Sequence, residues 1–369
     1  MFNLKILLIG PLPDPINGCS LANQTFLEYL KKQNNCQIKT INTNTDPKIQ
    51  GVQGQFNWIK LFGFIKVYFE IYKIFIAKNI YMTPGQSFWG VLKYAPFIML
   101  AWLLKKPIIM HIHGNYLGTQ YQLLSGIKKK IFKFLVSRSS AGIVLSRSLH
   151  DNFNGLLTKD KIYIVENFAN DELISSEVIR KNSDQLKLLW LSNLMEEKGI
   201  LYFLDALILL KNRNVPFEVK LAGKIEDGLE QNIHQKLTEL GESAEYLGVV
   251  YGEQKKAQLL AANVFVFPTY YTMEGQPISL IEAMATGNII VTTDHAGIPD
   301  IVGSENGYLL KPRDIASLVD QLENIANNLH QDIEKFSEFN QAYVKHNFTE
   351  EVFGQKIMNI IVNISNPKA

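Results

Sequence analysis

The stretch "NVFVFPTYYTMEGQPISLIEAMATGNIIVTT", residues 263–293, decides the expected fold. Its apolar run at 263–268 is typical of a buried strand, residues 278–286 are typical of a helix that ends at Gly287, and residues 288–293 are again strand-like. A strand, a helix and a second strand in this order predict a parallel pair, because parallel neighbours need a long crossover connection. The same alternation recurs along the rest of the chain.

Apolar runs rich in β-branched residues form two series of predicted strands. They cover residues 5–10, 79–84, 107–113, 142–146 and 161–167 in the first series, and 186–192, 217–223, 245–250, 263–268, 288–293 and 307–312 in the second. Helices are predicted at 198–212, 253–262 and 314–327, the last with Asp314 as its N-cap. The predicted fold class is therefore α/β, with two doubly wound Rossmann-like domains.

The length of 369 residues exceeds what one hydrophobic core usually organises, so two domains are expected. The first is predicted over residues 1–168 and the second over 186–349, with a polar linker at 169–185. A C-terminal helix at 350–369 is expected to pack back on the first domain. Since ligands bind at the carboxyl ends of the strands in such folds, we expect the two domains to face a common cleft.

The composition excludes several classes of protein. A hydrophobic content of 47% and a charged content of 20% describe a globular chain. The two cysteines, Cys19 and Cys36, form no CxxC pair, which gives no zinc pattern and indicates a reducing compartment. The apolar start is too short for a signal peptide, and the longest apolar stretch, 94–104, is about half of a membrane span. We therefore expect a cytoplasmic protein without a transmembrane segment.

Two carboxylates, Glu274 and Glu282, stand in the loop and the helix that follow the strand at 263–268. Gly275 allows a close backbone approach, Pro277 suits the first turn of a helix, and the free N–H groups up to Ser279 predict an anion-binding site. A carboxylate can accept two hydrogen bonds from a vicinal diol, so the pattern fits a phosphate between two sugar-type diols. On spacing alone, the more ordinary interpretation is a solvated helix residue and a loop acid.

The context of this segment resembles a known family. "PTYYTMEGQPISLIEAMATGNIIVTTDHAGIPDIV" (268–302) is similar to the signature of retaining glycosyltransferases of family 4, glycosyl transferases group 1, which have the GT-B fold and act in bacterial surface polysaccharide assembly. Further segments that resemble the family are "LSNLMEEKGILYFLDAL" (191–207), "GEQKKAQLLAANVFVFPT" (252–269), "PLPDPINGCS" (11–20) and "HIHG" (111–114). Asn288 and Asn263 depart mildly from the family's usual Pro and Asp.

The resemblance implies a transferase that moves a sugar from a nucleotide-diphosphate sugar, with a UDP-sugar as the expected donor, to a glycan acceptor with retention of configuration. Glu282 would hold the ribose diol, Glu274 the hydroxyls of the transferred sugar, and Lys198 the charge of the leaving diphosphate. His113 would face the sugar from the first domain, with His111 as the alternative. The other implied donor-binding residues are Gly275, Gln276, Pro277, Ile278, Gly18, Asn193, Gly223 and Val250.

One departure concerns the charge on the diphosphate. The family often has an Arg at the position of Asn193, so another cation must substitute or Lys198 must carry more of the charge. No Asp-x-Asp triplet of the kind that binds a metal–diphosphate occurs, so neither a metal ion nor a further cofactor is expected. Lys198 and the helix end would take the place of the cation.

Other functions fit the fold class less well. A dinucleotide-dependent oxidoreductase needs a G-x-G-x-x-G turn, whereas the first loop has three prolines between Gly10 and Gly18. A nucleotide-sugar epimerase of the same fold and a glycosyltransferase with a soluble acceptor remain alternatives. A non-catalytic polysaccharide- or membrane-binding module is disfavoured by the complete set of Glu274, Lys198 and Glu282.

The net charge of +2 hides a basic region. From Phe56 to Arg138 there are 12 Lys and Arg residues and a single acid, Glu70. Residues 56–79, with Lys60, Lys66, Lys73 and Lys78, and residues 125–138, with Lys128, Lys129, Lys130 and Lys133, alternate aromatic and basic side chains.

This pattern suits a surface that docks on an anionic membrane, to reach a polyprenyl-diphosphate-linked acceptor at the inner face of the plasma membrane. The alternative is that both helices cover the first sheet and the lysines form their solvated face. No nucleic-acid-binding motif accompanies the charge, so nucleic acid is not an expected partner.

Overall fold

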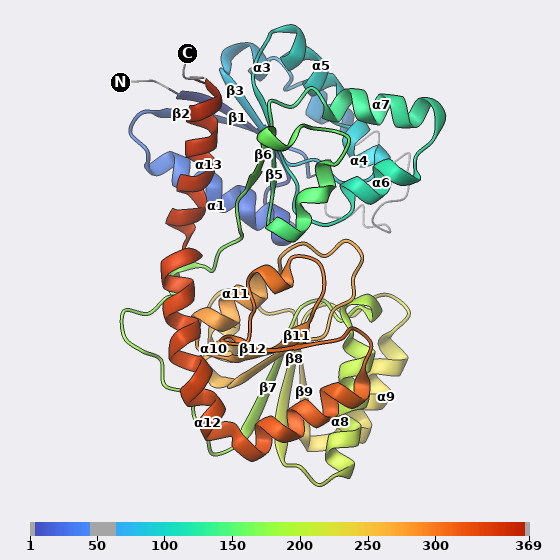
Figure 1. Ribbon diagram of the computed structural model, residues 1–369, viewed down its shortest axis with the longest axis vertical. Coiled ribbons are helices and arrows are strands. Elements are labelled where there is room, and N and C mark those ends of the chain that lie inside the picture. Colours follow the sequence, from blue (N-terminus) through green and yellow to red (C-terminus); the bar gives the residue numbers. More distant parts are fainter. Residues whose placement is uncertain (1–3, 45–63, 366–369) are drawn as a thin grey trace. The chain divides into compact units, whose positions relative to one another are not determined.

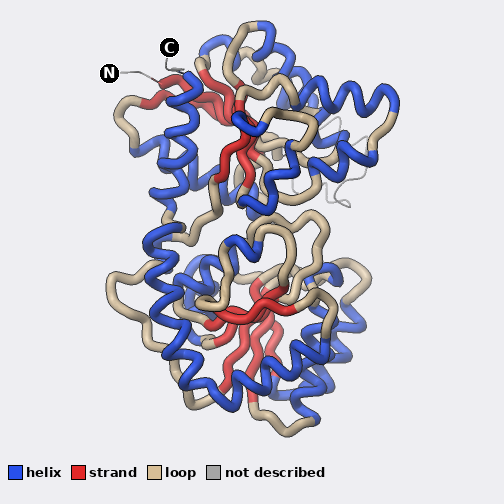
Figure 2. The backbone as a smooth tube through the Cα atoms, viewed as in Figure 1, coloured by secondary structure: helices blue, strands red, loops and turns tan. Residues whose placement is uncertain are grey.

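The computed structural model describes residues 4–44 and 64–365, and the chain divides into two compact units. Unit 1 consists of Met1–Asn167 and Glu350–Ala369, and unit 2 of Phe168–Thr349. Each unit is a six-stranded sheet with helices on both sides (Figures 1 and 2). All of the strand pairs are parallel. The predicted class, two doubly wound Rossmann-like domains, is confirmed.

The sheet of unit 1 has the strand order β2-β1-β3-β4-β5-β6. Its strands are β1 (Leu4–Gly10), β2 (Cys36–Asn42), β3 (Asn79–Met82), β4 (Ile108–His111), β5 (Ala141–Val144) and β6 (Ile162–Ile164). Five of them lie where apolar runs predicted them. β2 was not predicted, because it forms the edge of the sheet and polar residues alternate with apolar ones along it.

Helices cover both faces of this sheet. They are α1 (Gly18–Lys32), α3 (Lys73–Ile76), α4 (Phe88–Leu92), α5 (Ala95–Leu103), α6 (Leu117–Leu123), α7 (Gly126–Val136) and α13 (Glu350–Ser365). α13 packs against α1, while α3, α5 and α7 pack side by side on the other face (Figure 1). A Cβ added at Gly354 of α13 would lie 2.2 Å from the ring of Tyr29 on α1, so only glycine allows this close packing.

The sheet of unit 2 has the order β12-β11-β10-β7-β8-β9. Its strands are β7 (Leu186–Leu191), β8 (Phe217–Ala222), β9 (Ala244–Gly248), β10 (Val264–Phe267), β11 (Ile289–Thr293) and β12 (Gly307–Leu310). All six agree with the predicted ranges to within a few residues. The chain proceeds from β7 outward to β9, and then from β10 outward in the opposite direction. The strand order therefore reverses between β7 and β10, and ligands of such sheets bind at the carboxyl side of that point.

The helices of unit 2 follow the predicted ranges, with one extension, except for α9, which was not predicted. They are α8 (Ile200–Asn212), α9 (Glu230–Leu240), α10 (Gly252–Ala261), α11 (Ile278–Ala285) and α12 (Ile315–Asn347). Asp314 caps α12 as predicted, because its carboxylate accepts the amide of Ser317 at 3.0 Å. α12 does not end at residue 327. It kinks at Asn328 and continues, because its second half buries a further apolar stripe that includes Phe336 and Val344.

Within residues 4–44 and 64–365, none of the helices combines the length and the apolar character that crossing a bilayer requires.

Candidate active site

The loop after β10 and the start of α11 form an anion-binding backbone. Pro277 is the N-cap of α11 and supplies no side-chain cap. Among the described residues, the amides of Ile278 and Ser279 have no hydrogen-bond partner. The loop is held by the segment that follows β11, since the amide of Gly297 donates to the carbonyl of Gly275 at 3.1 Å. Two free amides and the positive end of the helix can therefore receive a phosphate.

Lys198 lies at the point where the strand order reverses. It ends the short 3₁₀ turn Glu196–Lys198, and its Nζ donates to Ser192 Oγ at 2.9 Å and lies 5.6 Å from the ring centre of Phe267. Ser192 follows β7 and Phe267 ends β10, so the ammonium lies over the carboxyl ends of both strands. It forms no ion pair with any acidic residue that the structure describes, which leaves its charge available to a ligand.

The turn that carries Lys198 is fixed to the loop that carries Glu274. Gly199 has φ +88°, and a Cβ there would lie 2.3 Å from the carbonyl oxygen of Pro268. The amide of Tyr270 donates to the carbonyl of Glu197 at 2.9 Å. The amide of Glu274 donates to the carbonyl of Tyr271 at 2.8 Å, which closes a turn in this loop. Lys198 and the loop of Glu274 are thus neighbours although more than one strand separates them in the sequence.

Glu282 is buried on the inner face of α11, with 2% of its surface exposed. Its Oε1 accepts from Lys255 Nζ of α10 at 2.6 Å. Burial raises the pKa of the Glu282 carboxyl, and the Lys255 ammonium acts in the opposite direction. The interpretation of Glu282 as a solvated helix residue is therefore wrong. The pairing of Lys255 with Glu282 could not be predicted from the sequence, because no spacing rule relates residues on two separate helices.

Asn193, Gly223 and Val250 follow β7, β8 and β9 at the same edge of the sheet. The amide of Gly223 donates to the carbonyl of Gly248 at 2.7 Å, and a Cβ at Gly223 would lie 1.9 Å from the carbonyl oxygen of Ser192. The structure therefore brings the predicted residues of unit 2 together along one edge. Lys224 joins them, since its carbonyl accepts the amide of Leu194 at 2.8 Å.

Gly18 lies at the first position of α1 in unit 1, after β1. The amides of Cys19 and Ser20 are already bound by the side chain of Asn17, at 3.1 and 3.0 Å, so fewer amides remain free here than at α11. Of the described atoms, none comes within 4 Å of a Cβ added at Gly18. Packing within the chain thus does not require this glycine.

His111 and His113 stand at the end of β4 with their ring centres 4.0 Å apart. His111 Nδ1 lies 2.7 Å from the hydroxyl of Tyr81, whereas both ring nitrogens of His113 are buried without a partner among the described residues. Burial lowers the pKa of His113 to about 3, so its imidazole is neutral at physiological pH. Nε2 of His111 is likewise buried without a partner among the described residues, so His113 has two free ring nitrogens and His111 has one.

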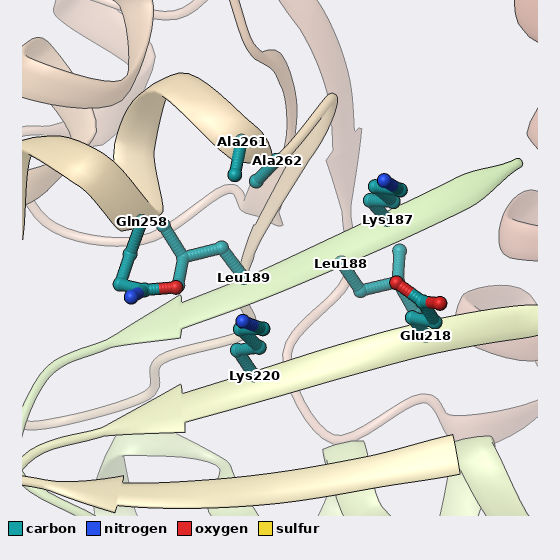
Figure 3. A pocket seen from close by; sticks show the side chains of 8 residues that line it. All are labelled: Lys187, Leu188, Leu189, Glu218, Lys220, Gln258, Ala261 and Ala262. Carbon is teal, nitrogen blue, oxygen red and sulfur yellow. The ribbon is translucent and has the colours of Figure 1, made fainter. Parts of the chain in front are cut away.

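Two hollows lie away from these residues. One, of about 20 Å³, has room for roughly one water. It lies where Lys187 and Glu218 begin β7 and β8, beside the end of α10 (Figure 3). The other is an open groove of about 320 Å³ in unit 1, lined by Leu27, Lys31, Ile38, Lys39, Thr40 and Lys73. Neither coincides with the carboxyl edge of a sheet. In the described ranges, no three His, Cys, Asp or Glu residues gather as a metal site would require.

Comparison with known proteins supports the family resemblance. Residues 185–328 match the model for glycosyl transferases group 1. A relative from Escherichia coli K12 named "Putative colanic acid biosynthesis glycosyltransferase" is 26% identical over 210 residues, 55% of this chain and 51% of the relative. The chain thus spans about half the length of the first curated relatives that it matches.

Two solved structures share the fold over nearly the whole chain. Sucrose-phosphate synthase from Thermosynechococcus elongatus has a TM-score of 0.76 at 16% identity, and covers 99% of this chain and 100% of its own. An Anabaena protein in complex with UDP has a TM-score of 0.73 at 15% identity, and covers 98% of this chain and 100% of its own. The resemblance to group 1 glycosyltransferases and the GT-B fold are confirmed.

Proposed function

We propose that this chain, which has the GT-B fold and matches glycosyl transferases group 1 over residues 185–328, is a retaining glycosyltransferase of family 4 in bacterial polysaccharide biosynthesis. Its donor is a nucleotide-diphosphate sugar, with a UDP-sugar as the first candidate, and its acceptor is a glycan. The observation that carries the proposal is the convergence of Lys198, the open amides of α11 and buried Glu282 at one edge of unit 2.

Each group then has a separate task. Lys198 and the amides of Ile278 and Ser279 bind the diphosphate, and Glu282 accepts the ribose hydroxyls. Glu274 binds hydroxyls of the transferred sugar from the loop before α11, and His113 contacts that sugar from unit 1. Gly275 and Gln276 supply backbone contacts, and Gly223 and Val250 lie near the base. Gly18 leaves room for the phosphates.

The reaction needs no nucleophile from the protein. The bond between the sugar's anomeric carbon and the phosphate oxygen breaks, and the acceptor oxygen attacks from the same face. The acceptor's proton moves to the departing phosphate oxygen, so configuration is retained. Lys198 stabilises the charge that develops on that phosphate, as a preorganised cation does. We propose that no metal ion takes part. Turnover should therefore survive EDTA, and loss on chelation that Mn²⁺ or Mg²⁺ restores would contradict this.

Lys224 is our candidate for the cation that replaces the Arg often found in the family at the position of Asn193. It follows β8 at the same edge, and its exposed ammonium lies 3.4 Å from the still more exposed carboxylate of Asp227. Exposed pairs of this kind are weak, so the side chain can leave Asp227 for a diphosphate at little cost.

Unit 1 is proposed to dock on an anionic membrane surface, where the acceptor is linked to a polyprenyl diphosphate. α3, α5 and α7 are neighbouring helices on one face of the sheet (Figure 1). Exposed apolar side chains occur on all three: Phe75 and Ile76 on α3, Trp102 and Leu103 on α5, and Ile127 and Phe134 on α7. α7 also carries Lys128, Lys129, Lys130 and Lys133. Aromatic and basic side chains together suit the interface between water and lipid.

Some lysines of unit 1 are already engaged by other groups of the chain and are therefore less available to anionic headgroups. Lys73 pairs with Glu70 and donates to the carbonyl of Thr40, and Lys106 donates to carbonyls at the end of α3. Lys60, and all of residues 56–63, lie outside the described residues. We therefore assign the main electrostatic contribution to Lys128, Lys130 and Lys133, which are exposed on α7, together with Lys129.

Flotation with liposomes tests the docking. The wild type should float with anionic vesicles at low salt and be released at high salt, because each lysine near the headgroups contributes about 1 kcal/mol. Replacing Lys128, Lys129, Lys130 and Lys133 by Gln should abolish flotation and leave nucleotide binding intact. A wild type that never floats would favour a soluble acceptor.

Thermal-shift measurements with UDP, GDP and ADP test the donor site. UDP should raise the melting temperature, and an absence of stabilisation by all three would overturn the proposal. Incubation with the donor sugar alone separates a transferase from an epimerase, because only an epimerase converts the donor without an acceptor.

A further inference from the structure

The ion pair between Lys255 and Glu282 joins two helices that both follow strands at the carboxyl edge. Lys255 lies on α10 after β9, and Glu282 on α11 after β10, 27 residues further along the chain. The side chain of Glu282 is 3% exposed and that of Lys255 is 23% exposed. The lysine thus reaches from the surface to a carboxylate that is shielded from water.

The pair fixes the carboxylate in two ways. Lys255 Nζ binds Oε1 at 2.6 Å, which restricts rotation of the carboxylate and leaves its remaining acceptor positions for another donor. Among the described residues, Lys255 is also the one charged group that acts on this carboxyl. It opposes the rise in the pKa of Glu282 that burial causes. A protonated carboxyl would itself donate and could no longer accept two hydroxyls.

We infer that Lys255 is a positioning residue that holds Glu282 oriented as a double acceptor, and so determines the preference of the site for a ribonucleotide over a deoxyribonucleotide. The inference rests on the proposed function, in which Glu282 receives the ribose diol. Lys255 does not touch the donor in this assignment. It acts through Glu282 alone.

A purely structural ion pair would behave differently. It would affect the packing of α10 on α11, and its loss would weaken binding of every nucleotide alike. A positioning role affects the hydroxyl contacts only, so its loss weakens binding of UDP, which uses both hydroxyls, more than binding of 2′-deoxy-UDP, which keeps only the 3′-hydroxyl. The ratio of the two affinities therefore separates the roles.

The experiment measures dissociation constants of UDP and 2′-deoxy-UDP by calorimetry, for the wild type, Lys255→Met, Lys255→Arg and Lys256→Met. Lys256 is the matched control, since it neighbours Lys255 on α10 and has no ion pair among the described residues. Lys255→Met should weaken UDP binding by about 10- to 150-fold, the range of a charge-assisted hydrogen bond, and remove most of the discrimination. Lys255→Arg should retain it, and Lys256→Met should match the wild type.

The pH dependence supplies a second readout. Without Lys255, the pKa of Glu282 is raised further, so UDP binding by Lys255→Met should strengthen as the pH rises from 5.5 to 8.5. The same profile for wild type should be flatter. If Lys255→Met binds UDP as the wild type does, or loses both nucleotides equally, the inference is overturned while the proposed function stands. If the wild type binds neither nucleotide, the proposed function and the inference fail together.

Discussion

Replacing Lys198 by Met tests the assignment of the diphosphate site most directly. The methionine keeps the apolar length of the side chain over Phe267 and removes the charge and the hydrogen bond to Ser192. Because Lys198 forms no ion pair with the described acidic residues, the substitution leaves no carboxylate unpaired. The free energy of unfolding should therefore change little, and the effect should fall on the ligand.

The expected magnitude follows from one charge-assisted contact to a phosphate, about 1.5–3 kcal/mol, or roughly 10- to 150-fold in affinity. Binding of UDP should weaken by this factor, and the rate of transfer should fall at least as much, because the charge on the diphosphate grows in the transition state. Uridine has no phosphate, so its binding should not change.

Calorimetric titration with UDP, UMP and uridine provides the measurement. Lys335→Met is the matched control, because Lys335 is an exposed lysine of α12 that lies over the ring of Phe336. The reasoning is refuted if Lys198→Met binds UDP as tightly as the wild type, or if uridine binding weakens by the same factor as UDP binding.

Three further predictions follow from the structure. Glu274→Ala should reduce the rate of transfer by about 10- to 150-fold, the loss of a charge-assisted contact to the sugar, and leave UDP binding near the wild-type value; equal losses in both assays would contradict its role. Gly354→Ala should lower the free energy of unfolding by about 1–3 kcal/mol in urea titrations, since its Cβ would lie 2.2 Å from Tyr29, whereas Gly18→Ala should be tolerated. Asp314→Ala should lower the thermal stability by removing the cap of α12. Because the amide of Ser317 lowers the pKa of Asp314, the stabilisation by the cap is complete at neutral pH and is lost as the pH falls through that lowered pKa. The melting temperatures of the variant and the wild type should therefore converge in acid.

Most of the strands could be predicted from the sequence, because central parallel strands are buried on both faces and appear as continuous apolar runs. β2 was not predicted, because it is an edge strand in which Gln37 and Lys39 are exposed. The second half of α12 was not predicted, because Asn328 interrupts the helix without ending it. In both cases burial on one side, which a local pattern expresses weakly, decides the structure.

The candidate site was likewise predictable only in part. That the loops of Lys198 and Glu274 follow strands of one sheet could be predicted, and parallel strands bring such loops to one edge. The partner of Glu282 could not, because the contact with Lys255 depends on how two helices pack. The contact of His111 with Tyr81, which favours His113 as the group proposed to face the sugar, could not be predicted either. Pairwise contacts between distant segments thus remain hidden in a single sequence.

The edge position of β2 has a consequence for self-association. An unpaired strand edge is a template for pairing with another molecule, and proteins often protect such edges with charged side chains. Here Lys39 is exposed along the strand, and Lys73 donates to the carbonyl of Thr40 at 2.9 Å, which occupies one of the acceptors that a second molecule would use. The two lysines therefore help to keep the protein from associating through this edge.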